Sequence, residues 1–193
     1  MKHPENFTEV DSLGVDYLGF IFYPKSKRDA SSIDPNSTQK LKAKKVGVFV
    51  NEDLPTISEK VRQFGLSAVQ LHGDESVEFC KSVKAMNLEV FKVFSVGEDF
   101  DFEQLEPYKK HVDYFLFDTK GKERGGNGYT FDWSILESYD NEIPLILSGG
   151  INPENIESAK NIQGLNLYAL DLNSGIEIEA GLKDIEQLQS ALI

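Results

Sequence analysis

Residues 145–155, with the sequence LILSGGINPEN, combine a strand, a glycine turn and a helix start in a pattern that can bind an anion. Leu145–Leu147 predicts a short buried strand. The glycines of Ser148–Gly150 let a ligand approach the backbone because they carry no side chain. Asn152 is a preferred helix N-cap and Pro153 suits the first helical position, so free N–H groups would face an anion. The segment predicts a phosphate site, although taken alone a strand-to-helix turn without a ligand fits it equally well.

Two carboxylates directly follow apolar runs. Asp118 comes after Tyr114–Phe117, where the low dielectric constant of an apolar rim favours the protonated form that a general acid needs. The glycine-rich segment at 125–128 suits a loop that covers a ligand, and it favours this interpretation over a loop carboxylate that accepts backbone N–H groups. For Asp171 the structural interpretation is stronger, because its carboxylate could cap a short helix beginning near Asn173.

Three further side chains carry chemistry of their own. Arg28 ends a run of cations, which is usually just solvated, but its place after Tyr17–Phe22 fits a two-pronged clamp for a substrate carboxylate. His72 precedes Gly73, and a histidine before a glycine turn is often a structural residue whose hydrogen bonds are satisfied. Cys80 falls on the buried face of an amphipathic segment and should be inert. No spacing resembles a metal site, and the glycine-rich segments match no dinucleotide or nucleoside-triphosphate fingerprint.

Short apolar runs alternate with segments of helical period along the chain. The predicted strands are Tyr17–Phe22, Val46–Val50, Ala68–Leu71, Val90–Phe94, Tyr114–Phe117, Leu145–Leu147 and Leu167–Leu170. The predicted helices are Pro4–Leu13, Leu54–Phe64, Ser76–Met86, Asn152–Asn161 and Leu182–Leu192, with Gly14 and Gly65 as helix-ending residues. Alternating strands and helices require a parallel sheet with right-handed crossovers. The regular period predicts one closed α/β barrel, residues 1–193, as a single domain, and a doubly wound open sheet is the competing architecture.

The composition restricts the classes of partner. A chain of 193 residues with 40% hydrophobic content can bury a substantial core. Its net charge of -12 argues against nucleic acid or an anionic membrane surface. No apolar run is long enough to span a bilayer, and the N-terminus has no apolar signal core. Because the single cysteine also fits a reducing compartment, we expect a cytoplasmic protein that binds a small molecule.

Seven motifs in order resemble those of the phosphoribosylanthranilate isomerase family: GFIFYPKSKR, VGVFVN, VQLHGDE, FDT, GGNG followed by FDW, LSGGINPEN and DLNSGIE. The resemblance extends from about Pro4 to Asp184. It implies a (β/α)8 TIM barrel without a cofactor. It also implies an Amadori rearrangement of N-(5′-phosphoribosyl)anthranilate to 1-(2-carboxyphenylamino)-1-deoxyribulose 5-phosphate in tryptophan biosynthesis.

Carried over by position, the resemblance assigns roles to residues of this chain. Asp118 matches the general acid that protonates the ribose ring oxygen, and Arg28 matches the arginine that holds the anthranilate carboxylate. In such barrels the phosphate is bound by two loops near strands seven and eight. The matching residues of this chain are Gly149, Gly150, Ser174 and Gly175. We expect further substrate contacts from His72, Gly126 and Asp171.

The family's first strand ends in Cys-Gly, and that cysteine is the general base that removes the C2′ proton. Met1 aligns directly after the pair, so we expect strands two to eight of the barrel and slow proton abstraction. We also expect unpaired sheet edges at Tyr17–Phe22 and Leu167–Leu170. A start placed too late on a complete enzyme is the favoured explanation. A truncated or degenerate copy comes second, and a neighbouring chain that fills the gap by strand exchange comes third.

Three functions compete. The first is the isomerase, a monomer or homodimer that acts on a phosphosugar once the N-terminal strand is restored. The second is a catalytically impaired pseudoenzyme that binds phosphosugars without proton transfer. The third is another phosphate-binding barrel of the tryptophan pathway, such as indole-glycerol-phosphate synthase. It is disfavoured because the lysines and glutamates on which those enzymes rely are absent after most strands.

Overall fold

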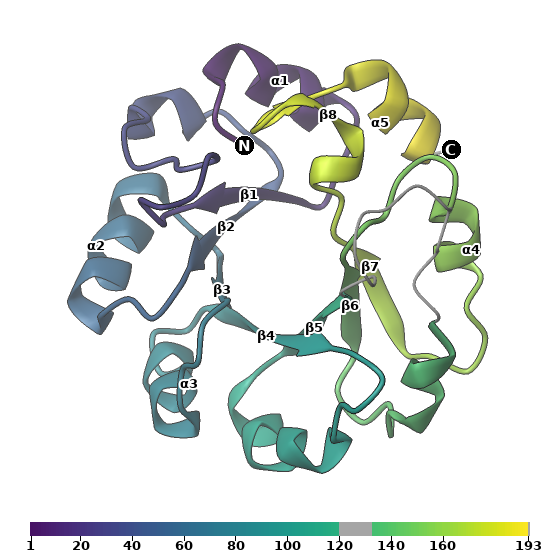
Figure 1. Ribbon diagram of the computed structural model, residues 1–193. Helices are drawn as coiled ribbons and strands as arrows, with labels where there is room; N and C mark the ends of the chain where they lie inside the picture. The colour runs from purple at the N-terminus through teal and green to yellow at the C-terminus, as the bar shows by residue number, and fades with distance from the viewer. Residues whose placement is uncertain (120–132, 193) are drawn as a thin grey trace.

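The computed structural model describes residues 1–119 and 133–192, and within them seven parallel strands form one sheet in chain order. These strands are β1 (Tyr17–Ile21), β2 (Lys44–Phe49), β3 (Ala68–Leu71), β4 (Glu89–Val96), β5 (Tyr114–Thr119), β6 (Leu145–Ser148) and β7 (Leu167–Leu170). Figure 1 looks down the axis around which they curl, with the helices on the outside. Because the strand order never reverses, the doubly wound sheet is wrong. The predicted α/β barrel is confirmed, with β1 and β7 as the edges of the sheet.

Helices cover the outer face of the sheet (Figure 1). The α-helices are α1 (Pro4–Ser12), α2 (Leu54–Phe64), α3 (Val77–Lys84), α4 (Ile156–Lys160) and α5 (Ile185–Leu192). The 3-10 helices are η1 (Pro35–Thr38), η2 (Phe102–His111), η3 (Trp133–Ser138) and η4 (Ser174–Ile176). A small antiparallel hairpin, β8 (Glu177–Glu179) with β9 (Leu182–Lys183), takes up residues that the sequence assigned to the start of the last helix. Among these described helices, none combines the length and apolar character needed to cross a bilayer.

Local sequence sets where α2 and α3 begin and end. The Asp53 carboxylate accepts a hydrogen bond from Thr56 N at 2.8 Å and caps α2, and Gly65 ends this helix at φ 61°. The Ser76 hydroxyl caps α3 by accepting from Phe79 N at 3.2 Å. Both helices therefore fall where the sequence pattern predicts them.

The segment after β6 differs from the prediction. α4 begins at Ile156, whereas the sequence predicts a helix start at Asn152. Asn152 Oδ1 accepts from Glu154 N at 2.8 Å, and Asn155 Oδ1 accepts from Asn152 N at 2.9 Å. Such side-chain bonds compete with helical bonds for the same backbone groups. The segment is a polar turn followed by a helix of five residues, so the predicted helix start at Asn152 is wrong, whereas the phosphate site in this segment stays a prediction.

Alternation along the strands decides which side chains point into the barrel. The inner cluster consists of Val46, Ala68, Phe91, Val93, Leu116 and Ile146, and a larger cluster fills the space between sheet and helices. Successive side chains of a strand point to opposite faces. Asp118 lies two residues beyond Leu116, and Ser148 lies two residues beyond Ile146. These polar residues therefore belong to the inner face at the carboxyl ends of the strands.

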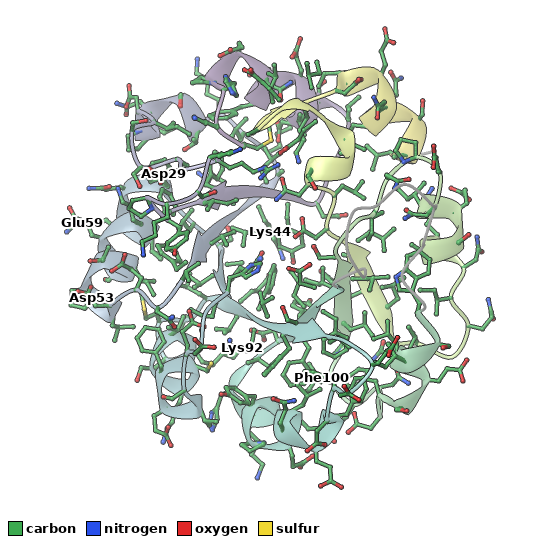
Figure 2. The ribbon with its side chains drawn as sticks, viewed as in Figure 1. Asp29, Lys44, Asp53, Glu59, Lys92 and Phe100 are labelled. Carbon is green, nitrogen blue, oxygen red and sulfur yellow. The ribbon has the colours of Figure 1, made fainter. Side chains whose placement is uncertain are left out.

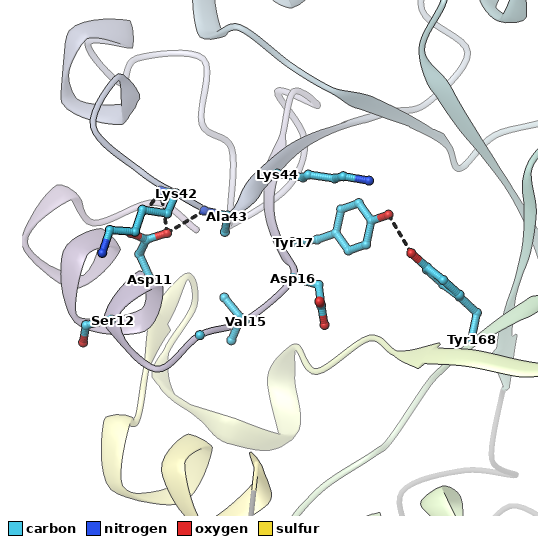
Figure 3. Close-up of a pocket in the computed structure, with 10 residues that line it drawn as sticks. Asp11, Ser12, Val15, Asp16, Tyr17, Lys42, Ala43, Lys44 and Tyr168 are labelled. Carbon is cyan, nitrogen blue, oxygen red and sulfur yellow. Dashed lines mark hydrogen bonds between the residues drawn. The ribbon is translucent and has the colours of Figure 1, made fainter.

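An aromatic and charged cluster, which we call the barrel floor, closes the amino ends of the strands. The Tyr17 hydroxyl donates to Glu89 Oε2 at 2.5 Å and lies 3.1 Å from the hydroxyl of Tyr168. Figure 3 draws the contact between the hydroxyls of Tyr17 and Tyr168, and Figure 2 labels Lys44 inside the ring of strands. Tyr168 stacks on Tyr114 with ring centroids 4.1 Å apart, and the Lys44 ammonium pairs with Glu89. A cavity of about 410 Å³ opens beside the floor, between α1 and the start of β2 (Figure 3). The floor connects β1 to β7, the two edges of the sheet.

A buried ion pair between Lys92 of β4 and Glu75 fixes the loop that follows β3. Lys92 Nζ donates to Gly73 O at 2.7 Å and to Glu75 Oε2 at 3.0 Å. Glu75 Oε1 accepts from Asn51 N at 2.9 Å and from Gly73 N at 3.0 Å. A Cβ on Gly73 would lie 2.4 Å from Asn51 Oδ1, so the packing of this loop requires glycine. The network holds the backbone next to His72.

We expect Lys92→Met to lower the free energy of unfolding by about 3–5 kcal/mol, because it leaves the Glu75 carboxylate buried without its cation. The two side chains are only 3% and 2% exposed, so water cannot readily replace the ammonium. Chemical denaturation measures the loss.

The matched control for this substitution is Lys160→Met, which breaks an exposed pair with Glu157. It should change the free energy of unfolding by less than about 1 kcal/mol. Adding Glu75→Gln to Lys92→Met should recover part of the loss, since the amide needs no counter-charge. Equal losses for the two lysine variants would contradict the role of the buried pair.

Candidate active site

The predicted site residues that the structure describes lie at or beyond the carboxyl ends of parallel strands, and therefore at one end of the barrel, which we call the mouth. The loop after β1 carries Arg28, the loop after β3 carries His72, and β5 itself carries Asp118. The loop after β6 contains Gly149 and Gly150, and the segment after β7 contains Asp171, Ser174 and Gly175. Gly126 lies outside the described residues.

Asp118 and His72 lie side by side at the mouth. Asp118 Oδ2 is 3.7 Å from His72 Nε2, and the two side chains are 31% and 37% exposed. Gln70 Nε2 lies 3.1 Å from His72 Nδ1 and orients the ring. Gln70 was not among the predicted site residues. The signal that could have found it is its position two residues before His72, on the same face of β3. Leu116, two residues earlier on the same face of β5, is buried in the inner cluster, so the Asp118 carboxylate lies above an apolar layer.

Asp171 is bonded to the end of the neighbouring strand. Ser148 Oγ donates to Asp171 Oδ2 at 3.3 Å, and Ser148 is the register partner of Asp118 across β5 and β6. Burial raises the pKa of the Asp171 carboxyl, and the charges of Lys183 and His72 oppose that shift only in part. The predicted capping role of Asp171 is wrong, because η4 begins after Asn173 and has no side-chain cap.

The two glycine loops at the mouth touch each other. Gly149 and Gly150 adopt φ angles of 91° and 68°, which residues with a Cβ rarely adopt. A Cβ on Gly175 would lie 2.0 Å from Ile151 O, so the segment after β7 packs directly against the loop after β6. The structure thus brings together the two segments that the sequence analysis assigned to one phosphate.

Arg28 is held by a carboxylate that the sequence analysis did not single out. Arg28 Nε and Nη2 donate to Glu177 Oε2 at 2.8 Å and 2.6 Å. Arg28 Nη1 has no hydrogen-bond partner within residues 1–119 and 133–192, so this nitrogen remains for a ligand. Glu177 lies in the motif DLNSGIE, but nothing local marks it as a partner of Arg28.

Cys80 and the acidic residues near η2 do not contribute to the mouth. Burial raises the pKa of the Cys80 thiol to about 11, and this side chain lies in the core as predicted. Among the described residues, three carboxylates come close enough to suit a metal ion: those of Glu106, Asp140 and Glu142. The Lys109 ammonium lies 2.6 to 2.7 Å from an oxygen of each, and it supplies the positive charge that such a cluster attracts.

The fold and the site together define an α/β-barrel protein with a polar mouth formed by glycine loops, a carboxylate and an arginine. The family model described as N-(5'phosphoribosyl)anthranilate (PRA) isomerase matches residues 2–192. The chain therefore belongs to the N-(5′-phosphoribosyl)anthranilate isomerase family.

Individual relatives agree with this assignment. The N-(5′-phosphoribosyl)anthranilate isomerase of Parabacteroides distasonis is 43% identical over 194 residues, covering 98% of this chain and 88% of that protein. The crystal structure of monomers made from the dimeric isomerase of Thermotoga maritima matches with a TM-score of 0.82 and 34% identity. A phosphoribosylanthranilate isomerase in complex with reduced 1-(o-carboxyphenylamino)-1-deoxyribulose 5-phosphate matches with a TM-score of 0.82 and 33% identity. Both structural matches cover 100% of this chain and 93% of the other.

The raised pKa of Asp171 predicts a specific pH dependence of stability. The folded state holds this proton more tightly than the unfolded state, so the contribution of Asp171 to the free energy of unfolding falls as the pH rises above about 4. Asp171→Asn lacks this contribution. We subtract the free energy of unfolding of the parent from that of the variant and expect this difference to increase from about pH 3.5 to about 5.5. This range lies roughly below the one in which histidines titrate. Chemical denaturation at each pH tests this, and a constant or decreasing difference would contradict it.

Proposed function

We propose that this chain catalyses the Amadori rearrangement of N-(5′-phosphoribosyl)anthranilate to 1-(2-carboxyphenylamino)-1-deoxyribulose 5-phosphate in tryptophan biosynthesis. One observation carries the proposal: an accessible carboxylate and two touching glycine loops meet at one mouth. Asp118 pairs in register with Ser148, and Gly175 packs against Ile151. Such a mouth suits a substrate with a phosphate at one end and an atom to be protonated nearby.

Asp118 is the proposed general acid. Its proton goes to the ribose ring oxygen, the bond from that oxygen to C1′ breaks, and the nitrogen lone pair forms the C1′=N bond of a Schiff base. Loss of the C2′ proton forms the C1′=C2′ bond of an enolamine and returns the C1′=N electrons to nitrogen. Addition of a proton to C1′ and loss of the proton of the C2′ hydroxyl then give the ketone. His72, 3.7 Å from the Asp118 carboxylate, is a proposed substrate contact beside the acid.

The two charged ends of the substrate are assigned to separate parts of the mouth. The anthranilate carboxylate is assigned to Arg28, whose guanidinium suits carboxylates. The phosphate is assigned to Gly149–Gly150 and Ser174–Gly175, where glycines leave the backbone accessible. Asp171, bonded to Ser148, and Gly126 are further proposed contacts.

The removal of the C2′ proton is not assigned to a residue of this chain. Cys80 is its one cysteine, and the thiol is buried with a pKa raised to about 11, which keeps it protonated. A strand ending in Cys-Gly, added before Met1, would supply the base that the family resemblance implies. We expect the extended version to turn over substrate about 10²–10⁴ times faster than the printed chain. Equal rates would remove the role given to that base.

We further propose that the enzyme works in the cytoplasm as a monomer or homodimer, without nucleic acid or a membrane as partner. The net charge of -12 disfavours polyanionic partners. The single cysteine is buried, which suits a reducing compartment. Gel filtration tests the oligomeric part of the proposal.

We expect Asp118→Asn in the extended version to lower kcat by about 10²–10⁴-fold, because the amide has no proton to give to the ring oxygen. The melting temperature should stay nearly unchanged, since the side chain is 31% exposed. Product formation at saturating substrate measures the first effect. Asp140→Asn, which changes an exposed carboxylate bonded to Lys109, is the matched control and should keep full turnover. Full turnover of Asp118→Asn would refute the acid assignment.

We expect Gly175→Ala to weaken binding of inorganic phosphate by about tenfold or more, because the added Cβ would push the two loops apart and spoil hydrogen bonds to the anion. Overpacking of this kind should also cost about 1–3 kcal/mol of stability. Gly97→Ala is the control, since a Cβ there meets nothing within 4 Å. Titration calorimetry measures both variants, and unchanged phosphate binding in Gly175→Ala would contradict the assignment of the loops.

A further inference from the structure

We infer that Glu177 and Lys183 form a buried positioning pair that couples the carboxylate-binding arginine to the phosphate-binding loop. This inference rests on the proposed function, because it gives the two residues a role in holding the two ends of one substrate. Neither residue needs to touch the substrate. Each acts through a neighbour that does.

At one end of the pair, Glu177 binds the guanidinium of Arg28 side-on. Glu177 Oε2 accepts from Arg28 Nε at 2.8 Å and from Arg28 Nη2 at 2.6 Å, while Glu177 Oε1 lies 3.1 Å from Nε. Two donor nitrogens of a planar guanidinium that bind one carboxylate restrict the rotation of its plane. Glu177 therefore fixes the direction in which the remaining donor, Nη1, can meet a ligand.

The loop end of the pair is a lysine that bonds to backbone carbonyl groups. Lys183 Nζ donates to Leu172 O at 2.9 Å and to Asn173 O at 3.1 Å, and it lies 3.2 Å from Asn173 Oδ1. The same ammonium lies 3.2 Å from Glu177 Oε1. These acceptors immediately precede Ser174, so Lys183 holds the start of the proposed phosphate loop in place.

Burial shields the pair from water. The side chains of Glu177 and Lys183 are 4% and 9% exposed, so water does not compete for their hydrogen bonds. The backbone of Lys183 is itself anchored, because its N–H donates to Asn6 Oδ1 at 2.8 Å and its carbonyl accepts from Asn6 Nδ2 at 3.2 Å. The lysine is thus held by α1 at one end and bonded to the mouth at the other.

The charge of Glu177 holds both cations. Arg28 and Lys183 each form an ion pair with the carboxylate of Glu177. Burial raises the pKa of Glu177, but the hydrogen bond from Arg28 and the charge of Lys183 outweigh it, and the net shift is downward. Glu177 therefore stays ionised and keeps both cations in position at neutral pH.

A physical coupling follows from this arrangement. An anion that further restricts the loop after β7 also further restricts Lys183, and through Glu177 it restricts the remaining motion of the Arg28 guanidinium. A carboxylate that then binds Arg28 meets a side chain that is already fixed. Coupling between two sites is reciprocal, so each ligand should strengthen the binding of the other.

The test measures how anthranilate changes the binding of inorganic phosphate. In the parent we expect anthranilate to tighten phosphate binding by about fivefold or more, the lower end of typical coupling between sites. In Glu177→Gln and in Lys183→Met we expect a factor near one. Glu177→Gln preserves the shape of the side chain, so it carries the test by itself if Lys183→Met does not fold. The same coupling in Glu177→Gln as in the parent, or none in the parent, would overturn the inference.

Two controls separate this inference from others. Lys109→Met removes a lysine that is equally buried, 8% exposed, and bonded to three carboxylates away from the mouth, so it should keep the full coupling. Loss of coupling in that variant would mean that any loosened lysine suffices, and would overturn the inference. The reduced product analogue 1-(o-carboxyphenylamino)-1-deoxyribulose 5-phosphate tests the proposed function separately. If the parent fails to bind it, the function fails. If the parent binds it but Glu177→Gln keeps full coupling, only the positioning pair fails.

Discussion

Parallel pairing of strands that follow one another in the chain is the constraint on which the candidate site depends. Each strand hydrogen-bonds to the next, so every carboxyl end reaches the same mouth and the loops that follow must meet there. Asp118 lies opposite Ser148 because β5 and β6 are in register. Arg28 and Glu177 are separated by 149 positions and still form a side-on ion pair across the two ends of the sheet. The strand topology therefore brings the candidate site residues to one end of the barrel, whatever the conformations of the individual loops.

Two buried lysines use the same arrangement at different places around the mouth. Lys92 pairs with Glu75 and donates to a carbonyl of the loop after β3, and Lys183 pairs with Glu177 and donates to carbonyls after β7. A buried ammonium is tolerated only when its desolvation is offset by a counter-charge and by complete hydrogen bonding. The loop must keep one conformation to supply those acceptors. Precision at the mouth therefore follows from electrostatics, whereas the strands behind it are held by apolar packing.

The sequence predicts the strands, α2 and α3 well because apolar period and capping residues are local signals. It misplaces the start of α4 because Asn152 can satisfy backbone groups either in a helix cap or in a turn, and only the tertiary contacts decide between them. It finds His72 and Asp118 from their places after apolar runs, and the roles of both remain predictions. The partnership of Arg28 with Glu177 could not be predicted, since it depends on how the two ends of the sheet meet. The barrel floor could not be predicted for the same reason, because its tyrosines meet only where β1 and β7 come together.

The floor has a consequence for how such a chain can change over time. Tyr17, Glu89 and Tyr168 lie at the amino ends of the strands, and the residues assigned to chemistry lie at the carboxyl ends. The floor therefore adds contacts between the two edges of the sheet at a distance from the residues assigned to chemistry. Substitutions in the floor can change how firmly those edges are held while leaving the composition of the mouth as it is.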